Sequence, residues 1–140
     1  MDFVTRIARE TLERNLSRQG IQPSAQRLAV AHYVLATTAH PSADAVFEHV
    51  RARVPKISRA TVYNTLNLFV RKGLLRQLVL AEGKVVFDPK VEPHHHFVDE
   101  GTGTIHDIPW EALDVRHVEA LRGVKVREYQ VVLRGTWRQP

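Results

Sequence analysis

Three consecutive histidines, His94, His95 and His96, are the residues whose type and spacing most directly indicate chemistry. Side chains alternate between the two faces of a β-strand, so His94 and His96 are expected to point to one side and His95 to the other. Two imidazoles on one face form a chelating pair for a divalent metal ion. The run is internal and lies in a patterned strand, which excludes an expression tag as its origin.

Three further residues of ligand type lie where they could join this pair. His40 falls between the second and third predicted helices, Asp88 ends a predicted hairpin, and Asp107 lies in the expected partner strand of the histidine strand. Together with His94 and His96 they supply three imidazoles and two carboxylates, a set that suits Mn(II), Fe(II) or Zn(II) rather than Cu(I). The other histidines are expected in the core or on the surface: His32, His49, His106 and His117.

The composition limits which elements and partners can serve this chemistry. The chain contains no cysteine, which excludes disulfides, thiolate zinc sites, iron–sulfur clusters and cysteine nucleophiles, so nitrogen and oxygen must hold any metal. The formal net charge of +5 is uneven: thirteen Lys and Arg face seven Asp and Glu through Asp88, and seven face eight after it. The first part is therefore expected to bind a polyanion. No apolar run approaches the roughly 18 to 20 residues of a membrane span, and the charged N-terminal stretch lacks a signal core, so we expect a cytoplasmic protein without membrane contact.

Helical spacing of apolar residues, with serines at cap positions and glycines at the ends, predicts four helices in the first part. They cover residues 3–19, 25–37, 43–54 and 59–73. Two short strands, 74–80 and 84–88, follow around the turn Ala81-Glu82-Gly83. Three compact helices followed by a hairpin are typical of the winged form of the helix-turn-helix.

The fourth helix is predicted to read DNA. Its expected inward side consists of Ala60, Val62, Leu66, Phe69 and Val70. This leaves outward the candidate DNA-binding residues Arg59, Thr61, Tyr63, Asn64 and Asn67, near the half of a recognition helix that enters the major groove. Arginine can bind guanine and asparagine adenine through two hydrogen bonds, whereas a tyrosine ring or threonine methyl can pack on the thymine methyl. Phosphate contacts are expected from Arg71, Lys72 and Lys84.

The segment PKVEP, residues 89–93, is interpreted as a linker between a DNA-binding domain, residues 1–88, and a second domain, residues 94–140. The second domain is predicted to contain strands at 94–98, 105–108 and 124–133 and a helix at about 110–121. A unit of about 50 residues is marginal alone, so we expect it to pair with a second copy. The predicted fold class is α+β: an N-terminal winged helix-turn-helix domain followed by a small C-terminal α/β dimerisation domain.

These motifs together resemble the ferric uptake regulator (Fur) superfamily over nearly the whole chain. The resemblance is carried by ISRATVYNTLNLFVRKGLL, AHPSADAVF, VVFD, HHHF and IHDI. It implies a metal-dependent repressor, a homodimer on a pseudo-palindromic double-stranded DNA operator, with a regulatory metal between the two domains. Carried over by position, the implied ligands are His40, Asp88, His94, His96 and Asp107.

The resemblance is divided among branches of the superfamily. A structural zinc held by four cysteines is not expected, because Asp99 and Thr102 stand where the first cysteine pair would be. The aspartate at position 107 makes the chain resemble the peroxide-sensing (PerR) branch. That resemblance implies Fe(II) or Mn(II) as the cofactor and His40 and His94 as the oxidation-sensitive residues. The histidine run without cysteine also resembles the haem-responsive Irr regulators, so a haem- or iron-responsive regulator remains an alternative.

Two other classes of function compete with a regulator. A metalloenzyme could use the same nitrogen and oxygen ligands to activate water, but five protein ligands leave little room for a substrate. The sequence also lacks a glycine-rich phosphate loop, an H-E-x-x-H motif and a nucleophile motif. The remaining alternative is a DNA-binding module that works without metal, which a metal titration would distinguish.

Overall fold

The computed structural model describes residues 3–80 and 83–138 of the chain. It divides into two compact units, Met1–Val91 and Glu92–Pro140. The expected linker, residues 89–93, spans this division. Within the described residues, no helix has both the length and the apolar character needed to cross a membrane.

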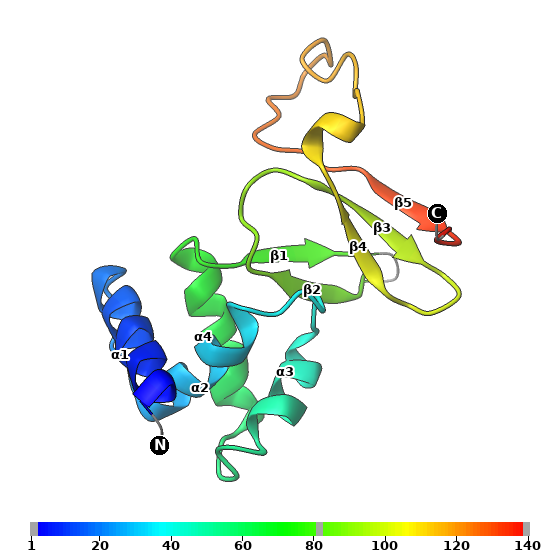
Figure 1. Ribbon diagram of the computed structural model, residues 1–140. Coiled ribbons are helices and arrows are strands. Elements are labelled where there is room, and N and C mark those ends of the chain that lie inside the picture. The colour runs from blue at the N-terminus through cyan, green and yellow to red at the C-terminus, as the bar shows by residue number, and fades with distance from the viewer. Residues whose placement is uncertain (1–2, 81–82, 139–140) are drawn as a thin grey trace. The chain divides into compact units, whose positions relative to one another are not determined.

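Four helices make up most of the first unit (Figure 1). They are α1 (Phe3–Arg18), α2 (Ala25–Val34), α3 (Ala43–Val50) and α4 (Arg59–Arg71). The side-chain oxygens of Ser24, Ser42 and Ser58 each accept a hydrogen bond from the backbone N–H three residues later. These bonds satisfy N–H groups that a helix start leaves without an intrahelical acceptor. The four predicted helices are confirmed, although α2 and α3 end three and four residues early.

The core of the first unit lies between its helices and includes Leu16, Val30, Val34, Val46, Val62, Leu66 and Phe69. One prediction for α4 is wrong, because Ala60 is exposed and Thr65 is buried instead. Thr65 is tolerated there because its hydroxyl donates a hydrogen bond of 2.7 Å to the Thr61 carbonyl oxygen, one turn earlier.

The predicted hairpin after α4 is confirmed as an antiparallel pair, β1 (Arg76–Val79) and β2 (Val85–Asp88). Two residues of its expected turn, Ala81 and Glu82, lie outside the described residues. The Phe87 N–H donates a 2.9 Å hydrogen bond to the Pro41 carbonyl oxygen. This bond ties the end of the hairpin to the segment that precedes α3.

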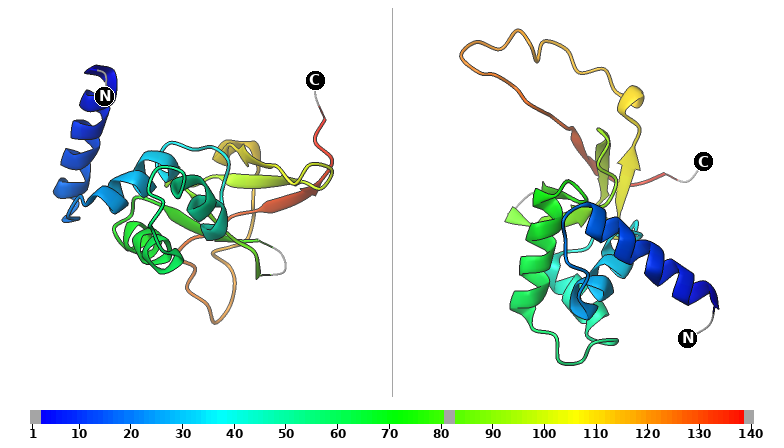
Figure 2. Two further views of the ribbon diagram at one scale, coloured as in Figure 1. Left: turned by 90° about the horizontal axis from the view of Figure 1, so that it is seen from below. Right: turned by 90° about the vertical axis from the view of Figure 1, so that its left-hand side faces the viewer.

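The second unit contains a sheet with the order β4-β3-β5, visible from two sides in Figure 2. Its strands are β3 (His95–Asp99), β4 (Ile105–Ile108) and β5 (Val132–Gly135). The pairing of β3 with β4 is antiparallel, with His96 opposite Asp107, and the pairing of β3 with β5 is parallel.

The helix predicted at 110–121 and most of the strand predicted at 124–133 are wrong. Only a 3-10 turn, Trp110–Ala112, forms, and a long connection without regular structure runs from it to β5. His117 adopts a left-handed backbone (φ 67°), which an α-helix cannot contain. Leu121, an apolar residue of the expected helix, is 56% exposed and so is not packed against the rest of the unit. Short helices depend on that packing.

The two units differ in their apolar cores. Among the described residues of the second unit, Ile105 is the one buried hydrophobic residue, and the other buried side chains are His94, His95, His96 and Asp99. The helical unit, by contrast, holds a continuous hydrophobic cluster. Helices with two small sheets give the predicted α+β class.

Candidate metal centre and recognition helix

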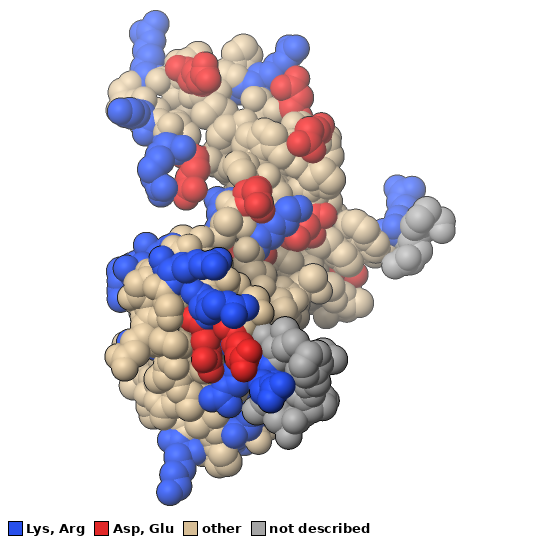
Figure 3. Space-filling view, turned by 60° about the vertical axis from the view of Figure 1, so that its left-hand side comes forward, with Lys and Arg blue, Asp and Glu red and all other residues tan. Residues whose placement is uncertain are grey.

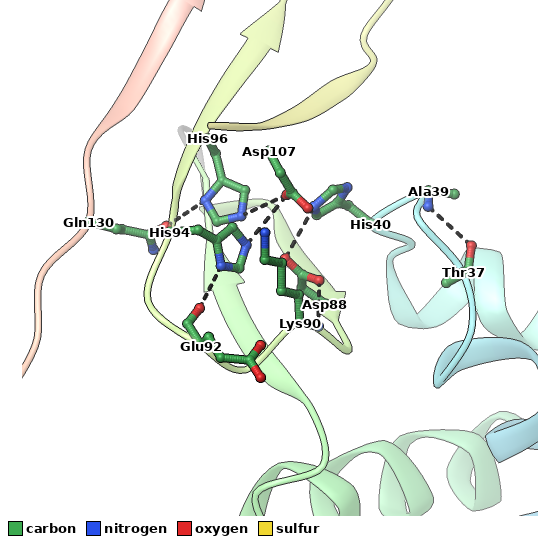
Figure 4. A network of polar contacts seen from close by, with 10 residues as sticks. All are labelled: Thr37, Ala39, His40, Asp88, Lys90, Glu92, His94, His96, Asp107 and Gln130. Atoms are coloured by element: carbon green, nitrogen blue, oxygen red, sulfur yellow. Dashed lines mark hydrogen bonds and ion pairs between the residues drawn. The ribbon is translucent and has the colours of Figure 1, made fainter. Parts of the chain in front are cut away.

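The second unit brings three of the five predicted ligands together (Figure 4). His94 and His96 lie on one face of the β3 segment with their ring centroids 4.5 Å apart. The antiparallel register sets Asp107 beside them, with its Oδ1 3.4 Å from His94 Nε2 and 3.6 Å from His96 Nε2. The alternation expected from the sequence therefore produces a compact group of two imidazoles and one carboxylate.

Hydrogen bonds on the far side of each ring fix its tautomer and orientation. His94 Nδ1 lies 2.7 Å from the Glu92 carbonyl oxygen, and His96 Nδ1 lies 2.7 Å from Gln130 Oε1. Both oxygens can only accept, so each Nδ1 carries a proton and donates it. In the neutral ring, Nε2 then carries a lone pair. This is the arrangement that metal-ligating histidines usually show.

The positions of His94, His96 and Asp107 show whether a cation would fit between them. With Nδ1 protonated, each Nε2 directs its lone pair toward the negatively charged Asp107 oxygen. Two electron-rich groups at this distance repel each other unless a positive charge lies between them, supplied by a metal ion or by a second proton on the ring. The donor set therefore fits a divalent metal ion.

The first unit brings the other two predicted ligands together. His40 Nε2 lies 3.2 Å from Asp88 Oδ2, and their side chains are 3% and 4% exposed. The other carboxylate oxygen, Asp88 Oδ1, accepts a 2.9 Å hydrogen bond from the Lys90 backbone N–H, which orients the group (Figure 4). A buried carboxylate is stable only with such partners.

His40 is also held in a strained backbone conformation. Its φ of 51° lies in the left-handed region, which residues other than glycine rarely adopt. The following residue, Pro41, disfavours helical conformations at His40 further. Strain of this kind persists where the surroundings enforce it and is concentrated at functional sites. The hydrogen bond between Phe87 and Pro41 and the contact with Asp88 provide that enforcement.

His95 points to the opposite face of β3, as the alternation predicts, and has a structural role. Its Nδ1 accepts a 2.9 Å hydrogen bond from the Val131 N–H, and its ring stacks on Trp110 with centroids 4.6 Å apart. Burial, reinforced by the neighbouring His94 and His96, lowers the pKa of His95 from its ordinary value. His95 is therefore a neutral side chain that holds the connection before β5.

The predicted DNA-binding residues occupy two sides of α4. Arg59 and Tyr63 face α3, where both side chains donate hydrogen bonds to Asp44. Thr61 and Asn64 line a groove on the other side, together with residues of α2 and the end of α4 that include Arg27 and Arg71. Asn67 is exposed and lines a hollow beside the hairpin.

Two basic side chains, Arg27 and Arg71, line the groove beside Thr61 and Asn64 of α4. Lysines and arginines gather on one face of the helical unit around a smaller acidic group (Figure 3). Arg27 could not be identified from the sequence, because its position beside Thr61 and Asn64 depends on the packing of α2 against α4. Gln130 could not be identified either, because it is 34 residues from His96.

A winged-helix unit whose helix α4 carries exposed polar side chains, in a chain with preorganised histidine and aspartate donors, is typical of metal-responsive DNA-binding regulators. Comparison with known proteins places it further. The model of the ferric uptake regulator family matches residues 18–134, so the chain belongs to that family. As a member of this family, it is a transcriptional regulator and not an enzyme. The resemblance to the Fur superfamily that its sequence motifs indicated is confirmed.

Three relatives illustrate this membership. The peroxide operon regulator of Bacillus subtilis (strain 168) is 32% identical over 133 residues, which cover 94% of this chain and 91% of the relative. The solved ferric uptake regulator of Vibrio cholerae is 25% identical with a TM-score of 0.71, over 89% of this chain and 98% of that one. PerR from Streptococcus pyogenes, solved in a study of peroxide sensing, is 28% identical with a TM-score of 0.53, over 93% and 90% of the two chains.

Proposed function

We propose that the chain is a peroxide-responsive repressor in which one Fe(II) or Mn(II) ion holds a homodimer in its operator-binding form. The proposed ligands are His40, Asp88, His94, His96 and Asp107. The observation that carries the proposal is the orientation of His94 and His96, whose Nδ1 protons are engaged and whose Nε2 atoms face Asp107. Its action on operator DNA implies a cytoplasmic location.

An ion bound by ligands of both units would couple metal binding to operator affinity. The first unit offers two ligands and the second offers three, so neither set alone supplies a complete shell for these ions. An ion that takes ligands from both would restrict the angle between the units. In a dimer, that angle sets the spacing of two recognition helices, which must match successive major grooves about 34 to 36 Å apart. A coupling of about 1 to 3 kcal/mol would change operator affinity about 5- to 150-fold.

The homodimer is supported by the composition of the second unit. Its described residues include one buried hydrophobic side chain, Ile105, and exposed Leu121, Val124 and Leu133. Strand β5 lies at the edge of the sheet order. A unit of this size rarely folds alone without a metal, disulfides or a partner, so a second copy would cover its apolar surface.

Peroxide sensitivity is proposed from the names of the relatives and from Asp107, the aspartate that resembles the peroxide-sensing branch. Iron(II) held by these residues would catalyse cleavage of the O–O bond of hydrogen peroxide, and the imidazole that is oxidised would supply both electrons of the net reduction. The imidazole of His40 or His94 would gain one oxygen atom at a ring carbon, and the other oxygen would leave as water. An oxidised imidazole is a poor ligand, so the units would separate from their common ion and the operator would be released.

Peptide mass spectrometry tests the peroxide response. The protein is loaded with Fe(II) or with Mn(II), treated with mild peroxide and digested. We expect a gain of about 16 Da, one oxygen atom, on His40 or His94 in the iron form only. An unmodified iron form that instead binds haem tightly through His94 to His96 would contradict the proposal and favour the haem-responsive alternative.

Selection from a pool of random DNA duplexes tests the regulatory function itself. The Mn(II)-loaded protein should recover a pseudo-palindromic operator, and the same selection in EDTA should recover little. A sequence recovered equally well in EDTA would indicate a DNA-binding module that works without metal. Recovery of no common sequence would contradict the proposed function.

A further inference from the structure

One carboxylate oxygen of α3 contacts two of the proposed base-reading side chains. Asp44 Oδ1 accepts a 2.8 Å hydrogen bond from the Arg59 guanidinium and a 3.4 Å hydrogen bond from the Tyr63 hydroxyl. Arg59 and Tyr63 are one helical turn apart on α4, so their side chains share a face. Asp44 therefore connects the first turn of α3 to the part of α4 that is proposed to enter the major groove.

Arg59 is held on three sides. Besides the bond to Asp44, its guanidinium lies over the Phe47 ring at 4.5 Å from the centroid, and it approaches the Glu48 carboxylate at 3.9 Å. Both Phe47 and Glu48 belong to α3. A long side chain that is free in solution must lose rotamer freedom when it binds a base, and these contacts remove part of that freedom in advance.

Stability does not explain this arrangement. The side chains of Arg59 and Asp44 are 56% and 66% exposed, and ion pairs at such sites contribute little to folding. Asp44 also places a negative charge on a unit whose surface carries many basic groups (Figure 3). That charge would repel DNA phosphates and would therefore weaken binding to every sequence alike.

We infer that Asp44 is a positioning residue that sets the sequence specificity of DNA binding. It orients Arg59 and Tyr63 toward the base edges, and its charge weakens DNA binding without regard to sequence. The inference rests on the proposed role of α4 in reading DNA. The orientation of Arg59 and Tyr63 strengthens binding to the operator alone, whereas the charge of Asp44 weakens binding to the operator and to unrelated DNA equally. Asp44 is therefore expected to change the ratio of the two affinities.

The experiment compares two DNA probes bound to the Mn(II)-loaded full chain. One is the operator recovered by the unsubstituted protein from the random pool, and the other is a scrambled duplex of the same base composition. Asp44→Ala removes the acceptor and the charge, and Asp44→Asn removes the charge while keeping an acceptor oxygen. Glu10→Gln is the matched control, because it removes the same charge from an exposed position of the same unit and leaves the contacts of Arg59 with Asp44, Phe47 and Glu48 in place.

We expect Asp44→Ala to lower the ratio of operator to scrambled affinity about 2- to 10-fold, the cost of leaving one or two side chains to be ordered on binding. Asp44→Asn should lower it less. Glu10→Gln should raise both affinities together and leave the ratio unchanged. A second selection with Asp44→Ala should recover a sequence with weaker preference at the bases that Arg59 and Tyr63 contact.

An unchanged ratio of operator to scrambled affinity in Asp44→Ala would overturn the inference. This includes an equal rise in both affinities, because Asp44 would then act only by repelling DNA. Thermal unfolding followed by circular dichroism checks that the variants remain folded. If Asp44→Ala does not fold, Asp44→Asn with the repeated selection decides instead. Failure of the proposed function looks different, because the unsubstituted protein would then recover no preferred sequence at all.

Discussion

Replacing Gln130 tests the proposed metal centre through a residue that would not touch the metal. Gln130 Oε1 accepts the Nδ1 proton of His96 at 2.7 Å, which orients the ring so that Nε2 faces Asp107. Gln130→Ala removes that acceptor and leaves a buried Nδ1–H to find another. The His96 ring would then sample other orientations and the opposite tautomer, in which Nε2 carries the proton and cannot bind a metal.

The expected loss can be estimated from this contact. Removing an outer partner of a ligating histidine typically lowers metal affinity about 10- to 100-fold, which corresponds to roughly 1.4 to 2.7 kcal/mol. Gln130→Glu has the opposite expectation, because a carboxylate is a stronger acceptor and raises the basicity of the imidazole. Gln130→Glu should therefore bind metal at least as tightly as the unsubstituted protein.

Competition between the protein and a fluorescent chelator for Mn(II) or Zn(II) measures the affinity directly. Arg127→Ala is the matched control, because the Arg127 side chain is 85% exposed and belongs to the same connection before β5. Equal metal affinities for Gln130→Ala and Arg127→Ala would refute the proposal that His96 is a ligand through Nε2. A loss in Gln130→Glu as large as that in Gln130→Ala would refute the assigned tautomer.

The remaining predictions concern DNA, assembly and acid stability. Arg59→Ala and Tyr63→Ala should each weaken operator binding, by about 1 to 3 kcal/mol where a base contact is lost, while light scattering still shows a dimer. Unchanged gel shifts in both would mean that another element reads the bases. EDTA should leave the homodimer intact in light scattering, and a monomer would contradict a dimer held by apolar packing. Hydrogen bonds from the Gly101 N–H and the Thr102 hydroxyl hold the pKa of Asp99 below its usual 3.8. As pH falls, Asp99 therefore binds a proton in the unfolded state before it does so in the folded state. The stabilisation that its carboxylate gives the folded state is complete above pH 3.8 and is lost as pH falls through the folded pKa. Acid unfolding should become less steep in Asp99→Asn but not in the exposed Asp114→Asn.

Features set by local chemistry could be predicted from the sequence. Ser24, Ser42 and Ser58 marked the starts of three helices because a cap acts within three residues of itself. The alternation of a strand separated His95 from His94 and His96, and it required only that the segment be extended. For the same reason, β4 was predicted at its observed residues, Ile105–Ile108.

Features set by distant contacts could not be predicted in this way. The helix expected near 110–121 does not form, because short helices depend on packing of their apolar residues and Leu121 is left 56% exposed. Gln130 reaches His96 across 34 residues, and Asp44 reaches Arg59 across 15. No periodic pattern in the sequence indicates either contact, because both contacts depend on how strands and helices pack together after they form.

A double-mutant cycle on operator affinity tests most directly the claim that one ion, bound by residues of both units, controls DNA binding. Affinity is measured with and without Mn(II) for the unsubstituted chain, for Asp88→Asn, for Asp107→Asn and for the double variant. We predict that Mn(II) strengthens operator binding about 5- to 150-fold in the unsubstituted chain, that each single variant loses most of this gain, and that the double variant loses no more. Equal affinities with and without Mn(II) in the unsubstituted chain, or a full gain retained in either single variant, would contradict the account.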